Sequence, residues 1–448
     1  MMQPLPSVTT PAQSSNSFRP AARELAICAL LCALLLFLAG CQPSPRVNVL
    51  GYLAGRSLGA YDPPPAGAST GSIQGRTLDE SGAPLAGATV VVAERWGTPH
   101  TAVSDAEGRY HIDGVPPGHY VPAAVAPAYD EVAAADVQGR PLIVAVEAGE
   151  MADAPPLTLK PRSPVPLPAD LADQVALAQT GTYSATTSFP AGAAAQVLSY
   201  QYQREGEAID TLRVYQPLDL AEDEKFPLLF FGYPGDVDNW EAVSVAFAAQ
   251  GYVVVAISPS PAWDVDIEQH ALDERIALHL ARAGSLSPHI GDGPAMALGG
   301  SFTSAVLHRL LLDEGDQFNG WVTVGGIANA FSGAAAFYAG KLELPPRYQF
   351  VIPALGQPNL FPLSFLRYSP VYTASQLPPT LIIHTGADRI IPIEQAYELE
   401  AALRASDVPV ETFYYKDVSH YLQIGEDLTP AGKEMFYLIF DFIERWGR

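Results

Sequence analysis

The sequence predicts a small all-β domain followed by a larger α/β domain whose sheet is mostly parallel. In residues 71–160, short strand-like runs alternate with turn residues, a spacing typical of a β-sandwich. In residues 181–448, apolar runs alternate with helical segments, which indicates parallel strands covered on both faces. More than one domain also suits a chain of 448 residues, because this is about three times the usual domain size.

The composition excludes several classes of protein. The chain has 25 basic and 48 acidic residues, a net charge of -23, so nucleic acid is not an expected partner. All three cysteines, Cys28, Cys32 and Cys41, lie in one short stretch. This clustering excludes a disulfide framework and a cysteine-rich zinc site. We therefore expect neither a metal nor a cofactor.

The N-terminus has the features of an export signal. Basic residues precede an apolar run at 25–40, which is shorter than the roughly 20 residues that span a membrane and is typical of a secretory signal. Residues 38–41, Leu-Ala-Gly-Cys, resemble the lipobox of bacterial lipoproteins. That resemblance implies that residues 1–40 are removed and that Cys41 carries a lipid anchor in the membrane. An ordinary signal peptide or a single membrane anchor is the alternative.

Two stretches are expected to connect the folded parts. Residues 41–70 are rich in proline, glycine, alanine and serine, which predicts a flexible tether. Residues 155–168 contain six prolines, and we place a stiff linker at 161–180. The second domain is then expected to occupy residues 181–448.

The β-domain has an ordered set of glycine-containing turns. Glycine suits these positions because tight hairpin turns need positive φ angles. The set resembles the carboxypeptidase regulatory-like domain with its transthyretin-like sandwich, which implies an accessory, non-catalytic module with an unidentified ligand. The stretches that carry the resemblance are Gly75-Arg76 and residues 82–90, 104–110 and 114–120.

Three polar residues follow predicted strands of the second domain. Ser301 comes after the apolar run 295–298 and opens a helix, where a sharp turn holds a hydroxyl clear of the sheet. Asp388 follows the strand at 380–384, and His420 follows the last strand. Because the carboxyl ends of parallel strands meet at one edge of the sheet, we expect these three side chains to lie together.

The order serine, aspartate, histidine is that of the α/β-hydrolase triad. The domain resembles that fold, particularly its dienelactone hydrolase and prolyl oligopeptidase branches. The resemblance implies Ser301 as nucleophile, His420 as general base and then acid, and Asp388 as the group that orients the imidazole. The stretches that carry it are residues 231–235 with Trp240, 251–252, 299–301, 377–380, 386–388 with Pro392, and 419–420.

By the same resemblance, the backbone N–H groups of Tyr233 and Phe302 form the oxyanion hole. Pro234 has no N–H and cannot serve. Two positions depart from the family pattern. Thr303 stands where the elbow sequence ends in glycine, and Phe231 stands where a histidine usually precedes Gly232.

Other acids are candidates for the third member of the triad. Asp417 lies in the same loop as His420, while Glu394 and Asp313 lie on helical stretches, so Asp388 is favoured. His384, at a strand end, is expected to pack rather than to react.

Residues 327–368 lack strand periodicity and hold many aromatic side chains. They are expected either to form a lid over an apolar pocket or simply to pack the domain. The sequence thus predicts an exported, lipid-anchored serine hydrolase, with a carboxylesterase of small esters as the leading interpretation. The alternatives are a serine peptidase of prolyl oligopeptidase type and an inactive lipoprotein that binds a surface ligand.

Overall fold

A computed structural model describes residues 54, 57, 67, 69–420 and 430–447. The predicted signal peptide, the lipid-attachment residue Cys41 and most of the 41–70 tether lie outside these residues. Among the described residues, no helix combines the length and the apolar character needed to cross a membrane.

The N-terminal domain is a β-sandwich. One sheet has the order β10-β1-β4, with β9 also paired to β1, and a second has the order β3-β2-β6-β7. Ile73 of β1 and Ile112 of β4 pack against Val90 and Val92 of β2 between the sheets. The strands are β1 (Gly71–Leu78), β2 (Thr89–Ala93), β3 (Pro99–Val103), β4 (Arg109–Val115), β5 (Gly118–Tyr120), β6 (Ala123–Val125), β7 (Val132–Ala133), β8 (Val144–Val146), β9 (Met151–Asp153) and β10 (Leu157–Thr158).

The second domain is built on a nine-stranded sheet of order β11-β12-β13-β15-β14-β16-β17-β18-β19. The pairs from β11 to β15 are antiparallel, and the pairs from β15 to β19 are parallel. Apart from the additional edge strand β11, this is the strand order of the α/β-hydrolase fold, which confirms the predicted fold class. The strands are β11 (Ala178–Thr187), β12 (Ala193–Arg204), β13 (Glu207–Gln216), β14 (Leu228–Gly232), β15 (Val253–Ile257), β16 (Ala295–Gly300), β17 (Phe318–Val324), β18 (Thr380–Thr385) and β19 (Val410–Tyr415).

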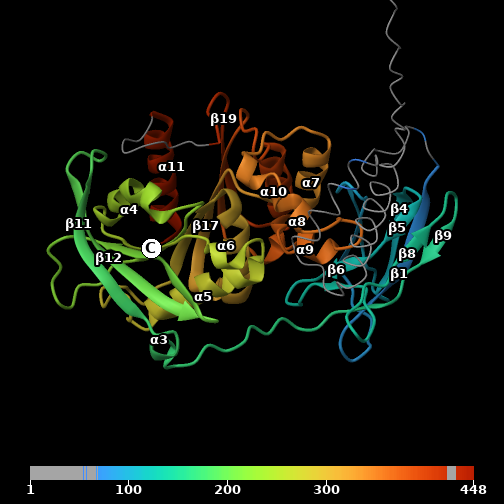
Figure 1. Cartoon of the computed structure of the whole chain (residues 1–448), viewed down its shortest axis with the longest axis horizontal. Helices are drawn as coiled ribbons and strands as arrows, with labels where there is room; N and C mark the ends of the chain where they lie inside the picture. Colours follow the sequence, from blue (N-terminus) through green and yellow to red (C-terminus); the bar gives the residue numbers. More distant parts are fainter. Residues whose placement is uncertain (1–53, 55–56, 58–66, 68, 421–429, 448) are drawn as a thin grey trace, which may run out of the picture.

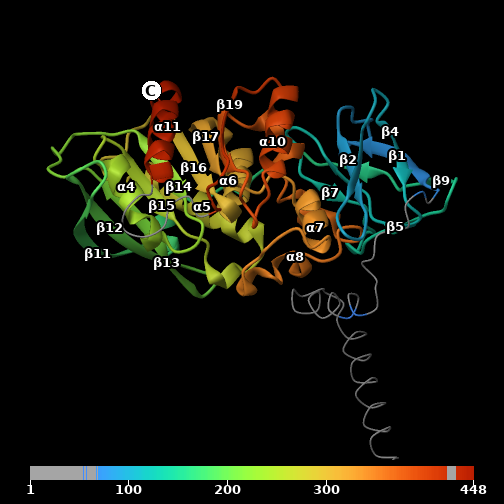
Figure 2. The same ribbon diagram turned by 90° about the horizontal axis from the view of Figure 1, so that it is seen from above.

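Helices cover both faces of this sheet (Figures 1 and 2). Val253 and Val255 of β15 pack with α5, α6 and α10 on one face, whereas Val254 and Ala256 pack with α4 and α11 on the other. A strand buried on both faces explains why the sequence of β15 is a continuous apolar run. The covering helices are α4 (Glu241–Ala248), α5 (Ile267–Arg282), α6 (Ser301–Glu314), α10 (Glu394–Ala405) and α11 (Pro430–Trp446).

The second domain begins earlier in the chain than predicted. The short helix α3 (Leu171–Gln174) precedes β11, which starts at Ala178. Leu171 and Val175 are buried in the same apolar cluster as α5, because residues four apart face the same side of a helix. The extended linker therefore ends near residue 170, and placing the start of the domain at residue 181 was wrong.

The aromatic segment at 327–368 forms short helices rather than strands. These are α7 (Ala330–Tyr338), α8 (Val351–Ala354) and α9 (Pro362–Leu366), with a 3-10 turn at Pro346–Tyr348. In both views α7 and α8 lie on the side of the hydrolase sheet that faces the β-sandwich (Figures 1 and 2). Phe331 and Phe365 are fully buried there, so these two aromatics pack an interface between the domains.

Candidate active site

Ser301 lies at a sharp turn between β16 and α6. Its φ is 51°, in the left-handed region that residues other than glycine seldom adopt. The two preceding glycines allow this turn to pack tightly, since a Cβ at Gly299 would lie 2.5 Å from Leu307 and one at Gly300 would lie 2.9 Å from the Val324 carbonyl oxygen. This strand–turn–helix geometry is the context expected of a nucleophile elbow.

Thr303 stands where the family's elbow pattern ends in glycine, and its side-chain hydroxyl has hydrogen-bond partners. The residue is buried, and its hydroxyl lies 2.7 Å from the Gly232 carbonyl oxygen and 2.8 Å from that of Gly300. The Thr303 hydroxyl oxygen also accepts a hydrogen bond from the Gly300 N–H. Thr303 thus ties the elbow to the end of β14.

We expect Thr303→Val to destabilise the chain by about 1–3 kcal/mol, because it keeps the side-chain shape but removes a buried hydrogen-bonding hydroxyl. Thr303→Ser, which retains the hydroxyl, is the matched control and should lose less. Urea unfolding of both variants measures the difference. Equal losses in the two variants would show that the hydroxyl has no role.

The structure brings the three predicted triad residues together. The Ser301 Oγ lies 3.1 Å from His420 Nε2, and His420 Nδ1 lies 2.6 Å from Asp388 Oδ2. The other Asp388 oxygen accepts hydrogen bonds from the N–H groups of Ile390 and Ile391, at 2.8 and 2.9 Å. The Asp388 side chain is completely buried and that of His420 is 9% exposed. A carboxylate held on this side selects the imidazole tautomer in which Nδ1 carries the proton and the unprotonated Nε2 faces the serine hydroxyl.

Gly325 is a part of the site that the sequence analysis missed. It follows β17 with a φ of 55°. A Cβ there would lie 3.6 Å from the His420 ring and 3.7 Å from the Asp388 carboxylate. These distances are ordinary van der Waals contacts, so it is the positive φ that favours glycine where the chain passes the histidine–aspartate pair. The available signal was the Gly-Gly pair directly after an apolar strand, the same pattern that precedes Ser301.

The two predicted oxyanion donors, Phe302 and Tyr233, differ in how their backbone N–H groups are placed for hydrogen bonding. Phe302 is the second residue of α6, where backbone N–H groups have no partner within the helix and the helix dipole favours negative charge. The Tyr233 N–H instead donates to the Ile257 carbonyl oxygen at 2.8 Å. The parallel ladder between β14 and β15 pairs Gly232 with Ile257 and continues one residue further. Tyr233 was therefore wrongly predicted as a free donor.

The other acids considered in the sequence lie elsewhere. Asp313 pairs with Arg162 at 3.0 Å, Glu394 is the first residue of α10, and Asp417 is exposed. His384 is buried, and this burial lowers its pKa. Its Nδ1 accepts a hydrogen bond from the Thr385 N–H.

A buried carboxyl group lies behind the elbow. Glu274 of α5 is almost fully buried, and its Oε1 would lie 2.9 Å from a Cβ at Gly232. Burial, with a smaller effect of the neighbouring Asp273 charge, raises the pKa of Glu274 well above its usual range. The group is therefore uncharged under conditions where an exposed glutamate is ionised.

This raised pKa predicts a pH dependence of stability. As the pH rises above the ordinary value of 4.5, the unfolded chain releases the Glu274 proton while the folded chain keeps it, so stability falls by at most about 1.4 kcal/mol per pH unit. Glu274→Gln should remove this dependence. Its free energy of unfolding, relative to wild type, should be higher at pH 8 than at pH 4.5.

The control for this measurement is Glu400→Gln. Hydrogen bonding from Tyr414, followed by that from Arg404, lowers the pKa of Glu400, so this substitution should cost stability above pH 4.5 and the cost should disappear as the pH falls. Urea unfolding at several pH values tests both variants. If the Glu274→Gln profile runs parallel to wild type, the assignment of a neutral Glu274 is wrong.

A metal site and a surface depression were both sought near the triad. In the part of the chain that the structure describes, no three histidine, cysteine, aspartate or glutamate side chains are grouped so that they could hold a metal ion. A depression of about 600 Å³ is lined by residues such as Phe318, Pro379 and Trp446. Phe318 begins β17 and Pro379 precedes β18, so this depression lies at the opposite end of the strands from the triad.

Comparison with known proteins supports the assignment of the β-domain. The family model of the carboxypeptidase regulatory-like domain matches residues 72–147, which confirms the resemblance seen in the sequence. No curated protein matches the chain.

Solved structures of peptidases and esterases are similar to the chain at low identity. The acylaminoacyl peptidase of Pyrococcus horikoshii is 15% identical with a TM-score of 0.46, over 80% of this chain and 54% of that one. The acetyl xylan esterase of Paenibacillus sp. R4 is 16% identical with a TM-score of 0.46, over 62% and 91%. An esterase of Thermogutta terrifontis is 16% identical with a TM-score of 0.41, over 53% and 89%. The chain thus spans about half the length of the peptidase.

Proposed function

We propose that this chain is a serine hydrolase that cleaves carboxylic esters through an acyl-enzyme intermediate. The observation that carries the proposal is the hydrogen-bonded series from Ser301 through His420 to Asp388, with the serine on a positive-φ turn at a helix N-terminus. The residue types, their order and their geometry together fit nucleophilic catalysis.

In the first half of the reaction, His420 Nε2 removes the proton from Ser301 Oγ while the oxygen attacks the ester carbonyl carbon. The Phe302 N–H stabilises the developing oxyanion. His420 then donates its proton to the departing alkoxide, which leaves as an alcohol, and the acyl group stays on Ser301. Water, activated by the same imidazole, hydrolyses the acyl-enzyme. Asp388 stabilises the imidazolium form in both halves.

The surroundings of the nucleophile favour an apolar acyl group. Phe302 packs at 5.9 Å from the Tyr368 ring, and Ile327 and Leu355 pack against the same buried cluster. Arg367, on the same side of the domain, lies 3.6 Å from the Glu268 carboxylate. These contacts support an uncharged ester rather than an anionic substrate.

The test compares a p-nitrophenyl ester with the p-nitroanilide of the same acyl group, using the purified chain. We expect turnover of the ester, with an initial burst of one p-nitrophenol per chain when deacylation is slower than acylation, and much slower turnover of the anilide. Faster cleavage of the anilide would favour the peptidase alternative. Absence of any turnover or burst with a panel of esters would contradict the proposal.

We also propose that the protein is exported and anchored by a lipid at Cys41, on the strength of the basic and apolar N-terminal sequence and the residues Leu-Ala-Gly-Cys. Growth of a bacterial host that expresses the chain with an alkyne fatty acid should label the wild type, but not Cys41→Ser. Cys28→Ser is the matched control and should still be labelled. Equal labelling of wild type and Cys41→Ser would contradict the lipid assignment.

A further inference from the structure

The β-sandwich packs directly against the segment that lies beside the nucleophile. We call residues 327–368 the cap segment. Val91 of β2 and Val125 of β6 share one buried apolar cluster with Phe331 of α7 and Phe365 of α9. The loop after β2 also approaches α7 closely, since a Cβ at Gly97 would lie 2.5 Å from the Phe331 carbonyl oxygen. The two domains therefore share a continuous apolar core at this contact.

Hydrogen bonds to backbone groups also join the β-sandwich to the cap segment and to Gln376, which follows that segment in the chain. The Val121 N–H donates to the Asn359 carbonyl oxygen at 2.8 Å, and the Asn359 side-chain amide donates to the His119 carbonyl oxygen at 2.8 Å. The Ala128 N–H donates to the side chain of Gln376 at 2.9 Å. Hydrogen bonds to backbone groups fix the position of one domain on the other more closely than apolar contact does alone.

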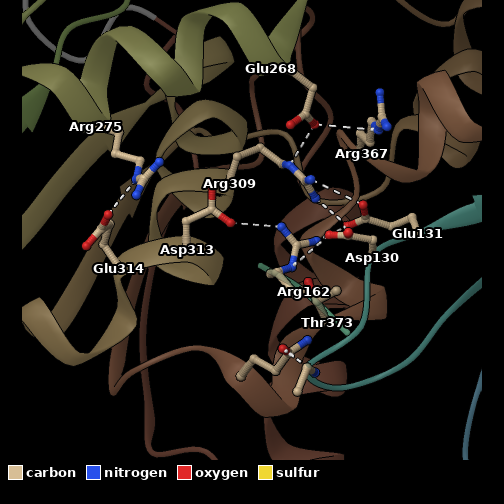
Figure 3. A network of polar contacts seen from close by, with 12 residues as sticks. Asp130, Glu131, Arg162, Glu268, Arg275, Arg309, Asp313, Glu314, Arg367 and Thr373 are labelled. Carbon is tan, nitrogen blue, oxygen red and sulfur yellow. Dashed lines mark hydrogen bonds and ion pairs between the residues drawn. The ribbon is translucent and has the colours of Figure 1, made fainter. Parts of the chain in front are cut away.

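A buried carboxylate of the β-sandwich reaches the helix that carries the nucleophile. Glu131 pairs with Arg309 of α6, and the side chains are only 3% and 4% exposed. Glu131 also accepts a hydrogen bond from Arg162 at 2.8 Å. Figure 3 shows the Glu131 carboxylate between these two guanidinium groups. Arg309 lies about two helical turns from Ser301 along α6.

Further ion pairs connect Arg162 and Arg309 to acidic residues of α5 and α6. Arg162 pairs with Asp313 at 3.0 Å, and Arg309 lies 2.9 Å from Glu268 of α5. Burial by itself would raise the pKa of Glu131, but the Arg309 charge and hydrogen bond, with Arg162, outweigh it and lower the pKa to about 2. Glu131 therefore stays charged at any pH suited to an assay, and without it Arg309 would be a buried cation with one anionic partner fewer.

The β-sandwich contacts both α6 and the cap segment, and both of these lie next to Ser301. The α6 helix begins with Ser301 and Phe302. On the cap side, the Ile327 N–H lies 3.3 Å from the Ser301 carbonyl oxygen, and Tyr368, which ends the cap segment, packs on Phe302. A shift of either part would move the serine hydroxyl or the oxyanion donor relative to His420, and displacements of about 1 Å can slow catalysis about a hundredfold.

We infer that the β-sandwich is a fixed part of the active-site framework, in which Glu131 acts through Arg309 as a positioning residue for the nucleophile helix. The accessory domain is then required for full activity, and residues 167–448 alone do not form a fully competent hydrolase. This inference rests on the proposed function, because its readout is the reactivity of Ser301.

The first experiment separates the domains without changing their interface. A protease recognition sequence is inserted after Pro166, which is exposed, and the purified chain is cut. We expect the two fragments to elute together in size-exclusion chromatography and to retain ester turnover. The inference is overturned if the fragments separate and the fragment that begins at residue 167 keeps the turnover of the intact chain.

The second experiment measures positioning in the full chain. Glu131→Gln should lower the rate constant for fluorophosphonate labelling of Ser301, and kcat for the ester, about tenfold per folded molecule, with a smaller change in KM. Glu131→Gln/Arg309→Met, which removes both charges, should recover part of this loss. Glu107→Gln is the matched control, because Glu107 makes an exposed pair with Arg109 in the same domain, and it should behave as wild type.

Folded fractions come from circular dichroism and unfolding curves, so that a loss of stability is not mistaken for a loss of positioning. If Glu131→Gln labels and turns over at the wild-type rate per folded molecule, Glu131 has no positioning role. If the wild type itself is not labelled, the proposed function fails instead, and co-elution of the cut fragments still reports whether the two domains form one body.

Discussion

Ser301→Ala is expected to lower kcat for ester hydrolysis by about 10⁶-fold, to the rate that binding and the oxyanion site alone support. The Oγ atom is the group that His420 Nε2 faces at 3.1 Å, and alanine removes it while leaving the rest of the elbow in place. Steady-state kinetics with a p-nitrophenyl ester, supported by an unfolding curve, measure this loss in a folded chain.

The matched control is Ser375→Ala. Ser375 is exposed and lines the depression at the far end of the strands, so the same chemical change there should leave kcat within about twofold of wild type, as expected of a surface substitution away from the site. Turnover by Ser301→Ala at a rate near wild type would mean that the esterase activity resides at another group.

Asp388→Asn is expected to lower kcat by about 10⁴-fold with little change in KM. An asparagine amide can donate to His420 Nδ1, which favours the tautomer that carries its proton on Nε2, and that tautomer cannot accept the serine proton. The side-chain oxygen of the introduced asparagine can still accept hydrogen bonds from Ile390 and Ile391, as the Asp388 carboxylate does, so the loop should fold as in wild type.

The discriminating control is Asp417→Asn, which changes the exposed acid in the same loop as His420. Its kcat should stay within a few-fold of wild type. Near-normal activity in Asp388→Asn together with a large loss in Asp417→Asn would reverse the assignment of the acid.

Local patterns were enough to predict much of the hydrolase sheet and the triad. The apolar runs predicted at 295–298 and 380–384 form the strands Ala295–Gly300 and Thr380–Thr385, because each is a short apolar run bounded by turn residues. Ser301, Asp388 and His420 could be found because parallel strands bring their carboxyl ends to one edge.

Features that depend on packing between distant segments could not be predicted in the same way. The Tyr233 N–H is used by the ladder with Ile257, and this depends on how far the parallel pairing extends. The apolar character of Val91 and Phe331 indicates burial without revealing that each is buried by the other domain. The Glu131–Arg309 pair joins residues 178 positions apart, which no local pattern encodes.

The central claim is that Ser301 is the activated nucleophile, and the most direct test is to locate the adduct of a fluorophosphonate on the intact chain. After incubation with the probe, mass spectrometry of the whole chain and of its peptides should show one adduct per molecule, on Ser301, and prior denaturation of the chain should prevent it. An adduct on a different residue, or none on a folded chain that hydrolyses esters, would contradict the account.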